Sequence, residues 1–190
     1  MKHIKILMII LVGIGVSAIA TDVGIISYGS PPLLNGIEGE KEWLDASEIE
    51  WADKTGSIKL KQDSLYVYLN IIDRDTVHSG VDLYLDNLAG AISMLHVSSA
   101  HGQRKMSGNI LGEMEFGPQK LWSSNIVENI FVDGKMKFLS PDVFEFQIDK
   151  KQLPSRMFKF MIHLKRPERW IPSAVDTLSS REWIEVELYR

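Results

Sequence analysis

Apolar residues along this chain recur at every second position far more often than at the helical spacing of three or four. Such alternation places successive side chains on opposite faces of a β-strand. The clearest run is 64–73, in which Leu65, Val67, Leu69 and Ile71 share one face. Its other face also carries apolar residues, so we expect this strand to lie in the middle of a sheet.

Four further segments have one apolar and one polar face, as strands that bury a single side do. They are 81–86, 144–149, 158–165 and 184–189, and weaker strand patterns occupy 25–28, 57–61, 92–98, 126–131 and 136–139. Short turns separate them, among them Asp133-Gly134, which is typical of a tight hairpin. Helix is expected only as short turns, within 39–46 and within 149–153 before Pro154.

Many short strands separated by turns favour two packed sheets over a parallel sheet with helices. We therefore expect an all-β fold, an antiparallel β-sandwich of jelly-roll or immunoglobulin-like topology. At 190 residues the chain is long enough for one such domain with a single core. It contains no cysteine, which excludes disulfides, and its formal net charge of −4 without a basic stripe argues against nucleic acid as a partner.

The first 20 residues have the parts of a secretory signal peptide: a basic start at Lys2 and Lys5, an apolar run over 6–16, and small residues ending at Ala20. The alternative is a membrane anchor, but the apolar run is shorter than the roughly 20 residues of a spanning helix. We expect 1–20 to be cleaved, 21–33 to form a lead-in strand or linker, and 34–190 to form the sandwich. The protein is then secreted or periplasmic, without a membrane span after cleavage.

Four stretches of the sequence, in the order in which they occur, match the pattern of a known family. They are LNGIEGEKEWLDASEIEW, IKLKQDSLYVYLNIIDRDT, VDLYLDN and FEFQIDKKQLP. Over roughly residues 34–188 the chain resembles the family 9 carbohydrate-binding modules and the related DOMON-like domains. The resemblance implies a non-catalytic β-sandwich that binds sugar, with structural calcium in some relatives and haem in some DOMON domains. The chain departs from the pattern at Ile148-Asp149-Lys150, which lacks the usual proline, and over 96–132, which matches none of it.

Sugar binding needs an exposed, rigid aromatic plane against which the C–H face of a sugar ring can stack. Trp43 and Trp51 lie in apolar turns and are expected in the core. Of the other three tryptophans, two follow loops and one lies on the outward face of the last strand. Two arginines beside them would bind hydroxyls or carboxylates of an acidic sugar. The alternatives are rings that cap the edge of the core and solvated arginines. The predicted ligand-binding residues are Trp122, Trp170, Trp183, Arg169 and Arg181.

Acidic residues gather at the ends of two strands that we expect to be neighbours, 64–73 and 81–86. Carboxylate oxygens in such a cluster suit Ca²⁺, so a structural calcium ion is one prediction and solvated turn carboxylates are the alternative. The predicted metal ligands are Asp73, Asp75, Asp82 and Asp86.

The favoured hypothesis is an exported, non-catalytic module that binds carbohydrate or a similar polar ligand. One alternative is a structural or protein-interaction domain of the cell envelope, with an envelope protein as its partner and no small-molecule ligand. The other is a haem- or metal-binding domain, for which His96 and His101 would have to converge through a bend. An enzyme is not expected, because the sequence contains neither a nucleophile elbow nor a distinctive pair of carboxylates.

Overall fold

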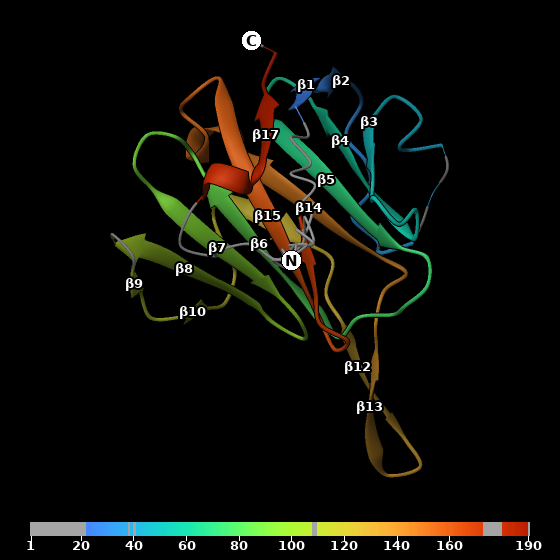
Figure 1. Cartoon of the computed structure of the whole chain (residues 1–190). Coiled ribbons are helices and arrows are strands. Elements are labelled where there is room, and N and C mark those ends of the chain that lie inside the picture. The colour runs from blue at the N-terminus through green and yellow to red at the C-terminus, as the bar shows by residue number, and fades with distance from the viewer. Residues whose placement is uncertain (1–21, 38, 40, 108–109, 173–179, 190) are drawn as a thin grey trace, which may run out of the picture.

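The computed structural model describes residues 22–37, 39, 41–107, 110–172 and 180–189. The expected signal peptide, 1–20, lies outside the described residues. Figure 1 shows two β-sheets that face each other, with a hairpin extending from one end. The all-β sandwich predicted from the alternating pattern is confirmed. Within the described ranges, helix is limited to two single turns, η1 (Lys150–Gln152) and η2 (Ser180–Glu182).

The larger sheet has nine strands. Its order along the sheet is β1 (Asp22–Ile25), β17 (Ile184–Glu187), β15 (Met157–Lys165), β6 (Gly80–Asp86), β7 (Ile92–Val97), β8 (His101–Ser107) and β10 (Glu115–Phe116), with β16 (Arg169–Ile171) beside β15 and β9 (Ile110–Leu111) beside β8. The first strand thus pairs with the last, and this pair is parallel.

The smaller sheet has six strands. Their order is β11 (Trp122–Ser124), β14 (Val143–Asp149), β5 (Tyr66–Asp73), β4 (Gly56–Gln62) and β2 (Ser27–Tyr28), with β3 (Ser47–Glu50) beside β4. The β2–β4 pair is parallel, as is the β1–β17 pair of the larger sheet. Each sheet is therefore mixed, whereas we expected purely antiparallel sheets. Strand β5 lies between β14 and β4, which confirms its predicted central position.

The core fills the space between the two sheets. The apolar faces predicted for the half-buried strands contribute to it, for example Leu83, Phe146, Phe160 and Val186, each no more than 1% exposed. Because strand side chains alternate, the intervening residues of β6 and β15 point to the outer face of the nine-stranded sheet. Among the described residues, no helix is long and apolar enough to cross a membrane.

A loop before β3 covers the outer face of the six-stranded sheet. Trp43 on this loop is 3% exposed and donates from Nε1 to Oε1 of Glu145 at 3.1 Å. The other carboxylate oxygen of Glu145 accepts from the backbone N–H of Gly36 at 2.9 Å, and the Lys61 ammonium lies 5.2 Å from the Trp43 ring centroid. Glu145 and Lys61 are both 0% exposed, so the covered face contains charged groups as well as apolar ones.

The extended hairpin consists of β12 (Glu128–Val132) and β13 (Lys135–Leu139). Its turn residues, Asp133 and Gly134, have φ values of 53° and 72°, as a type I′ turn requires. The tight hairpin predicted from these two residues is confirmed. Figure 1 shows that it projects away from the two sheets, and every residue of β13 is exposed.

Candidate ligand-binding face

A row of aromatic and polar residues crosses the outer face of the nine-stranded sheet. The strand registers place Trp170, His163, Asp82, His96 and Gly102 opposite one another on β16, β15, β6, β7 and β8. Neighbouring strands lie about 4.8 Å apart, so four such spacings give the row a length of about 19 Å. The row is therefore long enough to contact an extended ligand at several points.

Asp82 is the charged centre of this row. It is 4% exposed, and its two carboxylate oxygens contact Nδ1 of His96 at 2.6 Å and Nζ of Lys165 at 2.7 Å. Burial alone would raise the pKa of Asp82, but these hydrogen bonds and the Lys165 charge outweigh it and hold the pKa below its ordinary value. Asp82 is therefore a fixed anion that orients two polar side chains on the face.

Trp170 stacks on His163 at one end of the row. The ring centroids are 3.6 Å apart and the planes differ by 8°. Nε2 of His163 contacts the Glu168 carboxylate at 2.8 Å, while its Nδ1 lies 2.9 Å from Nζ of Lys165. Burial lowers the pKa of His163, so the neutral ring accepts from Lys165 at Nδ1 and donates to Glu168 at Nε2. This arrangement holds the half-buried Trp170 ring in one orientation.

A second, more apolar row runs beside the first. Met161, Tyr84, Met94 and Arg104 are opposite one another on β15, β6, β7 and β8. The Tyr84 ring lies 6.1 Å from that of Trp183 and 6.2 Å from that of Trp170. Burial raises the pKa of Tyr84 to about 12, so the phenol stays protonated near neutral pH. The two rows together make a face with apolar, aromatic and charged parts.

The β8 end of the face carries an exposed ring. Phe116 on β10 is 67% exposed and meets His96 edge to face, with centroids 6.3 Å apart. Gly102 lies beneath it, and a Cβ at this position would come within 2.8 Å of Sδ of Met114. Met114 and Phe116 therefore pack closely over Gly102, and a larger residue there would require the Met114 side chain to shift.

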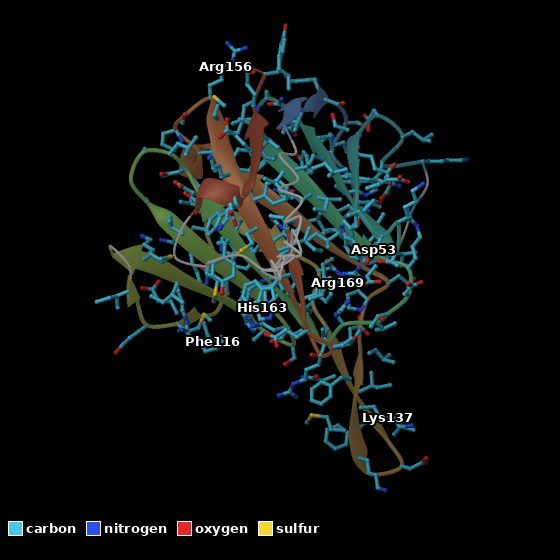
Figure 2. The ribbon with its side chains drawn as sticks, viewed as in Figure 1. Asp53, Phe116, Lys137, Arg156, His163 and Arg169 are labelled. Atoms are coloured by element: carbon cyan, nitrogen blue, oxygen red, sulfur yellow. The ribbon has the colours of Figure 1, made fainter. Side chains whose placement is uncertain are left out.

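Arg169, by contrast, joins the two sheets to each other. Its guanidinium contacts Oγ1 of Thr55 at 2.8 Å, Oδ2 of Asp73 at 3.1 Å and the Asp53 carboxylate, and it stacks 4.3 Å from the Trp51 ring. Figure 2 shows Arg169 beside Asp53. A cavity of about 170 Å³ opens next to it, lined by Ile49, Trp51, Asp53, Arg169, Ile171 and Ile184. The contacts of Arg169 tie the two sheets together, and Trp170 lines the same cavity as Arg169.

The predicted tryptophans have different environments. Trp122 is 4% exposed in the core, where its ring stacks on Phe146 at 6.1 Å and its Nε1 donates to Gln103 at 3.3 Å. Trp183 is also 4% exposed, beneath the outer face. The expectation of exposed rings is wrong for both, because each packs against a sheet, while Trp170 is half-buried on the outer face. Trp43 and Trp51, at 3% and 6% exposure, are buried as expected.

The side chain of Arg181 lies outside the described residues, so its predicted role stays a prediction. Arg169 does lie next to Trp170 in β16, but alternation turns it toward the opposite side of the strand, where its partners are Trp51 and two aspartates. Both residues nevertheless line one cavity, so the predicted pairing of this arginine with Trp170 around one ligand stays a prediction.

The predicted acidic cluster does not form. Asp73 ends β5 in the smaller sheet, whereas Asp82 and Asp86 lie on β6 in the larger one, so the expectation of neighbouring strands is wrong. The connection after β5 crosses between the sheets instead of turning back along the same one. Asp73 contacts His78 at 2.9 Å, Asp86 accepts from the N–H of Leu88 at 2.8 Å, and Asp75 is exposed. No group of three or more His, Cys, Asp or Glu among the described residues could hold a metal ion.

His96 and His101 point to opposite faces of the sheet. His96 contacts Asp82 on the outer face, whereas His101 lies 5.1 Å from the Trp122 ring and 3.0 Å from the carbonyl oxygen of Ser124. The two rings do not converge, so the geometry gives no support to a haem or metal site between them.

Several residues of the face were not singled out from the sequence. Asp82 was singled out only as a metal ligand. The outward positions of Tyr84, His163 and Lys165 follow from the alternation of β6 and β15, but their contacts depend on the pairing of these strands. Arg104 lies in 96–132, where the sequence matches no family pattern.

Comparison with known proteins gives similarity of fold. No protein-family model and no curated protein matches the chain. A family 9 carbohydrate-binding module from Caldicellulosiruptor kristjanssonii is similar to this chain at 15% identity and a TM-score of 0.45, both in its complex with glucose and in its complex with cellotriose. The alignment with the glucose complex covers 87% of this chain and 94% of the module. The alignment with the cellotriose complex covers 86% of this chain and 92% of the module. A candidate carbohydrate-binding protein from Bacteroides uniformis aligns over 87% of this chain and 98% of its own, at 7% identity and a TM-score of 0.46. These neighbours include the family that the sequence resembles.

Proposed function

We propose that the protein is an exported, non-catalytic module that binds carbohydrate on the outer face of the nine-stranded sheet. The observation that carries this proposal is the half-buried Trp170 ring, fixed by stacking on His163 at 3.6 Å at the end of a row of charged and aromatic residues. A sugar ring presents C–H groups to such a plane and hydroxyls to polar groups around it.

The polar groups of this face are held in place before a ligand arrives. The Lys165 side chain is 33% exposed and that of His96 is 20% exposed, and both are oriented by Asp82. The Glu168 carboxylate, 67% exposed, can accept hydroxyl hydrogen bonds while it contacts His163. Groups that are already ordered lose little entropy on binding, which favours affinity for a polar ligand.

The protonation states support binding without hydrolysis. Glycoside hydrolysis needs a carboxylic acid whose pKa is raised so that it can protonate the leaving group. On the proposed face the pKa of Asp82 is lowered. Burial raises the pKa of Glu145, but that carboxyl is 0% exposed on the opposite sheet beneath the Trp43 loop.

The test is calorimetry with a panel of oligosaccharides, together with pull-down on insoluble polysaccharides. We expect Trp170→Ala to weaken binding at least about fivefold, since one stacked aromatic ring contributes on the order of 1–3 kcal/mol. Tyr28→Ala is the matched control, because Tyr28 is 59% exposed on the other sheet. Absence of binding across the panel, or equal loss in both variants, would overturn the proposal.

The hairpin supports a second candidate function, docking to a protein of the cell envelope. Phe131 and Met136 are directly opposite each other, and Phe138 follows on the same face, at 73%, 52% and 61% exposure. Exposed apolar side chains on a projecting element are typical of interaction sites. Cross-linking in an envelope extract would test this: a partner captured by the wild type and lost with Phe131→Ser and Phe138→Ser favours docking, and unchanged capture contradicts it.

A further inference from the structure

Arg104 on β8 is a cation of the proposed face for which the described residues provide no counter-charge. Its Nε atom is buried and has no hydrogen-bond partner among the described residues. Arg74, Arg156 and Arg169 each pair with a carboxylate, whereas none of the ion pairs found in the described ranges includes Arg104. Withdrawing part of a guanidinium from water without a partner costs free energy, so an anion that paired with Arg104 would stabilise this side chain.

The surroundings of Arg104 are those of a ligand site. It follows Met94 and Tyr84 in the apolar row, with Met94 between Arg104 and Tyr84. Gly102, two residues earlier on the same face, leaves room for the exposed ring of Phe116. Arg104 therefore lies beside an aromatic surface at the β8 end, and Trp170 lies at the other end.

We propose that Arg104 binds an anionic substituent, a carboxylate or a sulfate, of a saccharide that lies along this face. This inference rests on the function proposed above and adds the class of ligand. The guanidinium presents parallel N–H donors that match the two oxygens of such an anion, whereas a neutral hydroxyl offers a single acceptor and no charge. Asp82, the buried anion of the neighbouring row, is already paired with Lys165 at 2.7 Å.

The test compares ligands that differ only in charge. An oligogalacturonide is measured by calorimetry beside its methyl ester, and a sulfated galactan oligosaccharide beside its desulfated form. At least one charged form should bind the wild type about tenfold or more tightly than its neutral form, as a charge-assisted hydrogen bond of about 1.5–3 kcal/mol predicts. The pair that shows the larger ratio identifies the anion as carboxylate or sulfate.

Variants separate this inference from the general proposal. Arg104→Gln should abolish the preference for the charged ligand, because it should weaken binding of the charged form far more than that of the neutral form. Arg104→Lys should keep part of the preference for the charged ligand, since lysine retains the positive charge but lacks the parallel N–H donors of a guanidinium. Arg74→Gln is the control, because Arg74 is 44% exposed on the smaller sheet and pairs with Glu48. The far-ultraviolet circular dichroism and urea midpoint of each variant establish that it is folded.

Each outcome decides between the two claims. Equal affinity of the wild type for charged and neutral forms overturns the role of Arg104 and leaves carbohydrate binding standing. A preference that survives in Arg104→Gln also overturns it. If neither form of either ligand binds and the wider panel is silent, both the inference and the proposed function are wrong.

Discussion

Replacing Asp82 with asparagine is expected to lower the free energy of unfolding by about 2–4 kcal/mol at pH 7. The side chain is 6% exposed and receives hydrogen bonds from His96 at 2.6 Å and Lys165 at 2.7 Å. Asparagine preserves the shape but removes the charge from both bonds, each worth about 1.5–3 kcal/mol when charge-assisted. The loss of stability is smaller than the sum of the two hydrogen-bond energies, because the Lys165 and His96 side chains, 33% and 20% exposed, can bind water instead.

The pH dependence gives this prediction a second, independent readout. Because the pKa of Asp82 is lower in the folded protein than in the unfolded chain, its contribution is fully present above the unfolded-state value of about 3.9. It is lost as the pH falls through the folded-state pKa, where the carboxylate takes up a proton. The stability difference between the wild type and Asp82→Asn should therefore be largest near neutral pH and shrink in acid.

Urea unfolding followed by tryptophan fluorescence at a series of pH values measures both quantities. Asp75→Asn is the control, since Asp75 is exposed and its replacement should change stability by no more than about 0.5 kcal/mol. An Asp82→Asn protein within about 0.5 kcal/mol of the wild type at pH 7 would refute the reasoning. So would a difference that does not shrink on acidification.

Three further substitutions test the packing. Trp43→Phe removes the Nε1 hydrogen bond to the buried Glu145 carboxylate and should cost about 1.5–3 kcal/mol in urea unfolding. Gly56→Ala would bring a Cβ within 2.2 Å of the backbone oxygen of Ile72, so we expect a drop of several degrees or more in Tm by calorimetry; an unchanged Tm contradicts the close approach. Phe138→Ser should leave the urea midpoint nearly unchanged, because Phe138 is 61% exposed, and a large loss would show that the hairpin packs against the body.

Alternation in the sequence predicts which face of each strand is buried, and it does so for physical reasons. Leu83, Phe146 and Phe160 are apolar because they fill the space between the two sheets. The expectation that 81–86 buries only one face is wrong, because every residue of β6 is buried. The same alternation placed Asp82 and His163 on the outer face. The Asp133-Gly134 turn was predictable because few other residue pairs adopt positive φ at both positions.

Strand pairing could not be predicted in this way. A two-residue period says nothing about which sheet a strand joins, so the crossing from β5 to β6 was missed, and with it the separation of Asp73 from Asp82. Trp122 lies on the three-residue strand β11, which is too short to show a period, so its loop-like sequence suggested exposure. Arg104 could not be identified because the lack of a partner for its Nε atom among the described residues is revealed only by three-dimensional contacts.

The parallel pairing of β1 with β17 has a consequence for how the protein matures. Asp22 is opposite Glu185, so an edge of the larger sheet joins segments from nearly opposite ends of the polypeptide. Contacts this distant in sequence form slowly, because the intervening chain must first be brought together. Until β17 has been synthesised, the edge of β15 that it covers stays unpaired. We therefore expect the larger sheet to be completed only after Ile184–Glu187 joins it.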